Sequence, residues 1–207
     1  MGDEGGRTRG LGARHEERRG QIAEALLAII DRGGLDAVNL RDVAAEAGVS
    51  LGSVQHYFRS KDQMLLFALD HISERGSERV RQSLGDGDQL PRTVLRRVLA
   101  ELVPTDERRL AELRIATAFT ARALVNPALA EHLSTGYAAL NDLLVLLLRQ
   151  ARQTGDAPTT LDPERAAAGL FALAEGLGTH VLLGQTDAST ALAVLDEYLD
   201  RLFAGPP

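Results

Sequence analysis

The fold is decided by residues 39–65, which read NLRDVAAEAGVSLGSVQHYFRSKDQML. Asn39 and Ser50 each precede a short apolar-periodic segment, and such side chains accept hydrogen bonds from the first free amides of a helix. Gly48, in the Gly-Val-Ser turn between the two segments, supplies the conformation that a sharp turn needs. This spacing predicts a helix-turn-helix over about residues 39–58, with one helix from residue 40 to 47 and a second, capped by Ser50, that runs to about Tyr57.

Longer helices are expected on either side of this motif. The preceding helix begins near Glu16 and ends at Gly33-Gly34, where glycine accepts the left-handed conformation. Its apolar residues recur every three or four positions, as in an amphipathic helix: Ile22, Ala25, Leu26, Ile29 and Ile30. The following helix runs from Lys61 to about Gln82, because Ser60 and Gln63 form a capping pair.

The second helix of the motif offers a polar face that suits the major groove of DNA. Glutamine pairs with adenine through two hydrogen bonds, whereas serine and histidine reach other base edges. Arginine and lysine contact phosphates, so Arg41, Arg59 and Lys61 are the expected backbone contacts. The predicted DNA-binding residues are Asn39, Arg41, Ser50, Leu51, Gly52, Ser53, Gln55, His56, Tyr57 and Lys61.

The stretch from about Glu16 to His71 resembles the TetR family of regulators, in particular its BetI-like branch. The Gly-Val-Ser turn, the Tyr57-Phe58 end of the second helix and the Ser60-Lys61-Asp62 restart carry this resemblance. The resemblance implies a phosphate contact by Lys61, the single lysine of the chain, and a homodimer that binds operator DNA and a small-molecule effector. Gln55 stands where many relatives have tyrosine, and Leu51 where many have a basic residue, so the operator sequence does not carry over.

Proline and capping signals predict five further helices beyond a polar loop at residues 83–89. The expected ranges are 91–103, 105–125, 127–154, 162–184 and 187–204. No stretch alternates as a strand does, so the predicted fold class is all-α, with an N-terminal helix-turn-helix domain and a helical C-terminal domain. We expect a flexible tail at residues 1–15, a DNA-binding domain at 16–62 and a ligand-binding and dimerisation domain at 63–207.

Two apolar stripes near the C-terminus predict a dimer interface. They repeat at helical spacing and suit a four-helix bundle built from two subunits. The interface residues predicted on this basis are Leu170, Leu177, Val181, Leu192, Leu195 and Leu199. The alternative is that both stripes are buried inside one subunit.

The family resemblance implies a ligand pocket in the helical domain. Polar residues on otherwise apolar helices, with a few aromatic residues, are the candidates to line it. They are Phe67, His71, Arg114, Thr117, Phe119, Thr120, Tyr137, Asn141, Phe171 and Glu175. Only 4% of the residues are aromatic, which argues against an aromatic cage for a quaternary ammonium ion.

Composition and motifs argue against several other classes of protein. The chain has 207 residues and no cysteine, which excludes disulfides, thiolate metal sites and a cysteine nucleophile. Its five histidines lack metal-ligand spacing, and it carries neither a phosphate-binding glycine loop nor a nucleophile elbow, so no catalytic residue, metal or cofactor is predicted.

The charge distribution is compatible with DNA binding. The net charge is −6, but residues 1–61 contain as many basic as acidic residues, so the acidic excess lies C-terminal to them. No apolar run is long enough to span a membrane, and a soluble cytoplasmic regulator is expected. A DNA-binding dimer without an effector, a protein-interaction role, and activation instead of repression remain as alternatives.

Overall fold

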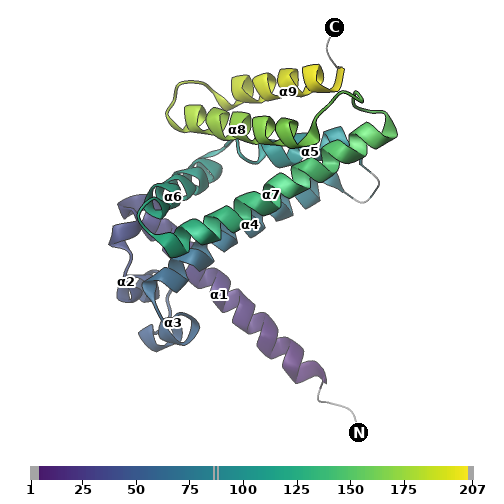
Figure 1. Cartoon of the computed structure of the whole chain (residues 1–207). Coiled ribbons are helices and arrows are strands. Elements are labelled where there is room, and N and C mark those ends of the chain that lie inside the picture. The colour runs from purple at the N-terminus through teal and green to yellow at the C-terminus, as the bar shows by residue number, and fades with distance from the viewer. Residues whose placement is uncertain (1–4, 86, 88, 205–207) are drawn as a thin grey trace. The chain divides into compact units, whose positions relative to one another are not determined.

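A computed structural model describes residues 5–85, 87 and 89–204 of the chain, with side-chain environments from residue 17 onwards. Its described residues form helices joined by short turns, without a strand (Figure 1). The predicted all-α class is therefore confirmed. No helix in this described part is both long and apolar enough to cross a membrane.

The predicted order of helices is also observed. The elements are α1 (Gly5–Gly33), η1 (Leu35–Ala37), α2 (Leu40–Glu46), α3 (Leu51–Tyr57), α4 (Lys61–Leu84), α5 (Pro91–Ala100), α6 (Glu107–Ala123), α7 (Pro127–Thr154), α8 (Pro163–Leu182) and α9 (Ala188–Ala204). Pro91, Pro127 and Pro163 each begin a helix, as their missing amide hydrogens favour.

The start of α1 differs from the expectation. Residues 5–15 are helical rather than a flexible tail, and residues 1–4 lie outside the described part of the chain. Extending an existing helix avoids the cost of nucleation. The packed C-terminal part of α1 can therefore stabilise the glycine-containing turns that precede it. Ile22 and Leu26 provide that packing, since neither side chain is exposed.

The chain divides into two compact units, which we describe separately. The first contains residues 1–74 and 115–119, and the second contains residues 75–114 and 120–207. The sequence predicts a boundary at residues 62–63, whereas these units divide within α4, after Glu74. In the first unit α1 packs against η1 and α2, and α2 packs against α3.

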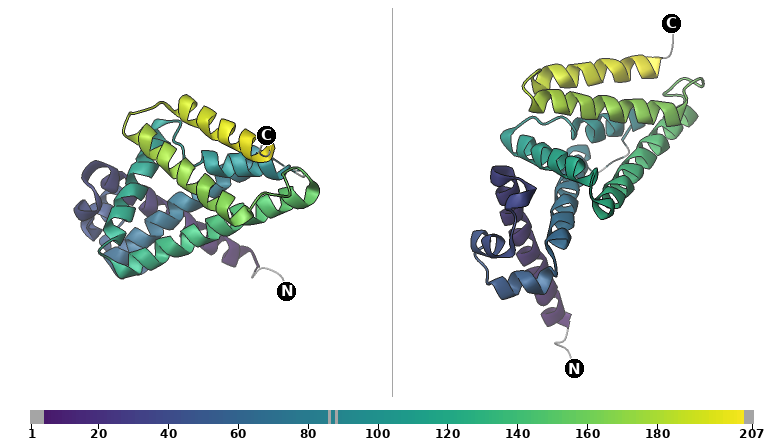
Figure 2. Two further views of the ribbon diagram at one scale, coloured as in Figure 1. Left: turned by 45° about the horizontal axis from the view of Figure 1, so that its top comes forward. Right: turned by 60° about the vertical axis from the view of Figure 1, so that its left-hand side comes forward.

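The second unit has its own hydrophobic core, built from α5, α7, α8 and α9. Figure 2 shows α8 and α9 side by side in both views. Its fully buried leucines include Leu95, Leu148, Leu170 and Leu195, one from each helix. Burial of each such side chain contributes roughly 1.5–3 kcal/mol.

Charged pairs at the surface of this core join α5 to α9. Arg96 donates to Asp196 through two hydrogen bonds of 2.6 and 2.9 Å, and Arg92 pairs with Asp200 one helical turn away. The hydrogen bonds with Asp196 raise the pKa of Arg96, although burial acts in the opposite direction.

Asp187 caps α9, and we expect this cap to be lost in acid. Its carboxylate accepts hydrogen bonds from the Ser189 hydroxyl and from the amide and hydroxyl of Thr190, which lowers the pKa of Asp187 from 3.8 to about 2. Because the folded-state pKa is lowered, the stabilisation is complete above the ordinary pKa and disappears as the pH falls towards about 2.

An Asp187→Ala variant tests this contribution. Its melting temperature should lie below that of the unchanged protein at pH 7, and the gap should close as the pH is lowered to about 2. A gap that stays constant over this range would contradict a capping role for the ionised carboxylate.

Candidate nucleic-acid interface and ligand site

Side-chain caps position the two helices of the helix-turn-helix, as predicted. Asn39 Oδ1 accepts hydrogen bonds from the amides of Arg41 and Asp42 at 3.1 and 3.0 Å, which starts α2. Ser50 Oγ accepts from the amide of Ser53 at 3.1 Å, which starts α3. Gly48 adopts a φ of 64°, a left-handed conformation that favours glycine, so the chain turns sharply between the helices.

Buried valines hold this pair of helices against the rest of the first unit. Val43 of α2 and Val54 of α3 are both inaccessible to solvent. A hydrogen bond of 3.0 Å from the Val49 amide to the Ala44 carbonyl oxygen closes the turn. The geometry of α3 is therefore fixed by its own caps and by the core beneath it.

The solvent-facing side of α3 is narrower than predicted. Gly52, Gln55 and His56 are exposed, whereas Leu51, Ser53 and Tyr57 are half-buried. The His56 and Tyr57 rings meet edge to face, with their centroids 5.4 Å apart. Gln55 and His56 are thus the polar side chains that α3 exposes most.

The residues expected to contact phosphates lie around this helix pair. Arg41 and Arg59 are exposed. The predicted DNA-binding residues Asn39 and Ser50 are exposed as well, although each uses an oxygen in its cap. Lys61, at the start of α4, is half-buried and donates to the carbonyl oxygen of Asp36 at 3.3 Å. This contact places Lys61 beside η1 within the same unit.

An ion pair that sequence analysis missed joins α1 to α2. Arg32 donates to both carboxylate oxygens of Glu46, at 3.2 and 2.8 Å. The fork of a guanidinium matches a carboxylate in this bidentate geometry. The 14-residue separation gives no local sign of the contact, because helical spacing relates only residues three or four apart.

The ten predicted ligand-site residues divide between the two units. Phe67, His71, Thr117 and Phe119 belong to the first. There, His71 pairs with Glu24 at 3.0 Å, the Arg19 guanidinium lies 4.5 Å from the centre of the Phe67 ring, and Phe119 is fully buried. The other six belong to the second unit: Arg114, Thr120, Tyr137, Asn141, Phe171 and Glu175.

Four of these six residues come together on α6, α7 and α8. The Tyr137 hydroxyl lies 3.4 Å from the Thr120 hydroxyl, and it is close enough to the Glu175 carboxyl group to influence the pKa of that group. The Phe171 ring meets the Tyr137 ring edge to face at 5.4 Å between centroids. We call these four residues the Tyr137 cluster. Arg114 is exposed on α6, and Asn141 lies one helical turn beyond Tyr137.

Partial burial changes the acidity of this cluster. It raises the pKa of Glu175, although the hydrogen bond with Tyr137 acts in the opposite direction. Burial likewise raises the pKa of Tyr137, and the charge of Glu175 adds to the effect. The cluster therefore contains a carboxyl group whose charged form is stabilised by a hydrogen-bond donor. It also contains two hydroxyl groups and an aromatic ring.

The predicted dimer residues need correction. Leu170, Leu195 and Leu199 are fully buried in the core of the second unit, so they cannot contact a partner subunit. Leu177, Val181 and Leu192 are half-buried. Helical periodicity correctly identified an apolar face, but it could not tell whether a neighbouring helix or a second chain covers that face.

A different surface of α8 and α9 remains exposed. It includes Leu183, Val194 and Tyr198, whose exposed fractions are 65%, 40% and 43%. Gly176 is exposed on α8, and a side chain added there would meet no atom within 4 Å. We call these four residues the α8–α9 surface.

Among the described residues, no three histidine, aspartate or glutamate side chains gather in a way that could hold a metal ion. A helix-turn-helix with capped helices, in a chain that also has a helical domain, is the architecture of DNA-binding transcriptional regulators.

Comparison with known families gives the particular kind of regulator. Residues 22–67 match the model of the bacterial regulatory proteins of the tetR family, and residues 91–204 match that of the C-terminal domain of BetI-type transcriptional repressors. The chain belongs to the TetR family, with a C-terminal domain of the BetI type.

Named relatives agree with this assignment. The chain is 33% identical to the HTH-type transcriptional regulator PksA of Bacillus subtilis, over 82% of this chain and 80% of that protein. It is 32% identical to the HTH-type transcriptional regulator BetI of Paraburkholderia phytofirmans, over 94% of this chain and 97% of that protein. These relatives are transcriptional regulators and not enzymes.

Solved structures resemble about nine-tenths of the chain. A TetR-family regulator from Rhodococcus sp. has a TM-score of 0.81 at 28% identity, covering 91% of this chain and 99% of its own. A transcriptional regulator from Saccharomonospora viridis, solved in complex with choline, has a TM-score of 0.77 at 25% identity, covering 90% and 97%.

Proposed function

We propose that this chain is a homodimeric repressor that binds a pseudo-palindromic operator and is released by a small molecule. The observation that carries the proposal is the capped α2–α3 pair, which presents Gln55 and His56 to solvent in a chain of the TetR family. Residues of α3 read base edges in the major groove, and Arg41, Arg59 and Lys61 contact phosphates.

The dimer forms through the α8–α9 surface. Exposed Leu183, Val194 and Tyr198 supply apolar area, and Gly176 allows close approach of a second helix. A two-fold dimer presents two copies of α3 to two half-sites, about 34 Å or a multiple of it apart along the DNA. Two subunits each contributing α8 and α9 form a four-helix bundle.

A Leu183→Glu variant tests the dimer. A charge placed in an apolar interface remains desolvated and unpaired, so the variant should sediment as a monomer and lose binding to a two-half-site operator. Leu124→Glu is the matched control, because Leu124 is also highly exposed but lies at the end of α6. Equal sedimentation of both variants as dimers would rule out this surface.

The effector binds at the Tyr137 cluster in this proposal. The carboxyl group of Glu175 and the hydroxyls of Tyr137 and Thr120 suit a small molecule that carries hydrogen-bond donors, and the Phe171 ring offers an apolar contact. The choline complex of the Saccharomonospora viridis regulator supports an effector for a chain of this kind.

Release follows if the effector prefers a conformation in which the two copies of α3 no longer match the half-site spacing. A ligand shifts such an equilibrium only by its difference in affinity for the two conformations. The experiment is a screen of small molecules that scores two readouts together. An effector raises the melting temperature and weakens operator binding, whereas a DNA-binding dimer without an effector shows neither response.

A further inference from the structure

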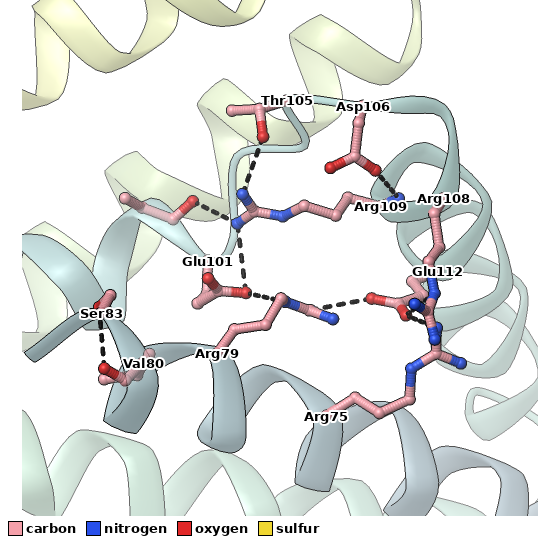
Figure 3. Close-up of polar contacts among 11 residues, drawn as sticks. Arg75, Arg79, Val80, Ser83, Glu101, Thr105, Asp106, Arg108, Arg109 and Glu112 are labelled. Carbon is pink, nitrogen blue, oxygen red and sulfur yellow. Dashed lines mark hydrogen bonds and ion pairs between the residues drawn. The ribbon is translucent and has the colours of Figure 1, made fainter. Parts of the chain in front are cut away.

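A network of charged residues surrounds the buried Glu112 in the second unit, apart from both sites described above. Figure 3 shows its members converging from α4, the end of α5 and α6. Glu112 is central, since it is the one buried charged residue among those whose burial is described. Its carboxylate pairs with Arg75 and Arg79 of α4, each at 2.9 Å.

The network continues from Arg79 to the end of α5. Arg79 Nε donates to Glu101 at 2.8 Å, and Arg109 of α6 pairs with the same Glu101 oxygen at 3.2 Å. Arg109 also donates to the Thr105 hydroxyl and to the Ala100 carbonyl oxygen, at 2.9 and 3.0 Å. We call the set of Arg75, Arg79, Glu101, Arg109 and Glu112 the Glu112 network.

These ion pairs connect α4 to neighbouring helices, a role that apolar packing has elsewhere in the molecule. The buried side chains of α4 are Met64, Leu65, Ala68 and Leu69, all in its first half. Residues 75–84 of α4 have no buried side chain, and the closely packed helix pairs of the second unit involve α5, α7, α8 and α9 instead. Ion pairs therefore join the second half of α4 to α5 and α6, without a fully buried apolar side chain on this part of α4.

The segment that carries Glu101 is also packed tightly against α8. A Cβ atom at Gly178 would lie 2.1 Å from the carbonyl oxygen of Leu102, so α8 approaches this backbone as closely as glycine allows. Glu101 and its neighbour thus link α8, which belongs to the proposed dimer surface, to Arg79 of α4. The same helix α4 begins at Lys61, three residues after Phe58, which is the C-cap residue of α3.

We propose that Glu112 and Glu101 are positioning residues for operator binding: they fix α4 to the dimerising domain and so set the spacing of the two recognition helices. The inference rests on the proposed dimer with two half-sites. Removal of the Glu112 charge leaves the half-buried Arg75 and Arg79 beside a neutral group, and their mutual repulsion frees the second half of α4.

The test compares operators with one and two half-sites. The operator is selected from a random duplex library by the unchanged protein, and affinities are measured by fluorescence anisotropy for the full operator and for a single half-site. The unchanged dimer should bind the full operator about a hundred-fold or more tightly than the single half-site. Once one subunit is bound, binding of the second subunit to its half-site is intramolecular. In Glu112→Gln, affinity for the half-site should persist while that preference falls about ten-fold or more.

Glu78→Gln is the matched control, since Glu78 lies on α4 but pairs with Arg81 of the same helix. It should keep the full preference. If Glu112→Gln fails to form a folded dimer by circular dichroism and sedimentation, Glu101→Gln replaces it, because that carboxylate is more exposed.

Two outcomes of this comparison would overturn the proposed role of the Glu112 network. A folded dimeric variant with an unchanged preference, or with equal losses on both DNAs, would show that the network serves stability alone. An unchanged protein that binds both DNAs equally would instead overturn the proposed two-half-site function, and this inference with it.

Discussion

Gly178→Ala should destabilise the second unit strongly for so small a change. The added methyl group would lie 2.1 Å from the carbonyl oxygen of Leu102, and that neighbour is backbone, which cannot rotate away. Either α8 or the segment after α5 must shift, and such overpacking costs about 1–3 kcal/mol or more. We expect a melting temperature lower by roughly 5–10 °C, measured by circular dichroism.

The same substitution at Gly136 is the control. Gly136 lies in the interior of α7, and an added Cβ there would meet no atom within 4 Å. Alanine favours a helix over glycine by up to about 1 kcal/mol, so Gly136→Ala should be neutral or stabilising. Similar melting temperatures for the two variants would contradict the close approach of α8 to Leu102.

Gln55→Ala should remove much of the sequence selectivity of DNA binding. Gln55 is exposed on α3, and a bidentate contact to adenine discriminates by about 1–3 kcal/mol. A dimer carries two such contacts, so operator affinity should fall by about 30-fold or more. Affinity for unrelated DNA should persist, because phosphate contacts supply it.

Two further variants separate base reading from charge. Lys61→Ala should weaken binding to all DNA sequences alike and reduce its salt dependence, as loss of a phosphate contact does. Gln82→Ala should change neither property, because this exposed glutamine hydrogen-bonds to Glu78 on α4. Equal loss of operator and unrelated binding in Gln55→Ala would contradict a base contact by this residue.

Local chemistry made the DNA-binding unit predictable. The capping side chains of Asn39, Ser50 and Ser60 predict three helix starts, and each of these caps is present in the structure. The capping pair of Ser60 differs in one detail, since Gln63 accepts from the amide of Arg59 and not from that of Ser60. Such signals act over three or four residues, within the range that a sequence displays directly.

Contacts between distant helices were not predictable in this way. The stripe that contains Leu170 and Leu195 has the same periodicity whether α8 and α9 cover each other or a partner subunit. Likewise, Arg75 and Arg79 look like solvated charges on an amphipathic helix, because their partner Glu112 is more than thirty residues away. The predicted ligand-site residues separate for the same reason: Thr120, Tyr137, Phe171 and Glu175 come together in the second unit, whereas Phe67 and His71 stack on each other in the first.

The most direct test of the central claim is selective DNA binding by the full-length protein. Genomic fragments bound by the protein are enriched, and their affinity is measured by fluorescence anisotropy against a scrambled duplex across a salt series. We predict a small set of fragments that share an inverted repeat and bind about a thousand-fold or more above the scrambled control, with affinity that falls as salt rises. Fragments bound no more tightly than the scrambled duplex would contradict a function as an operator-binding regulator.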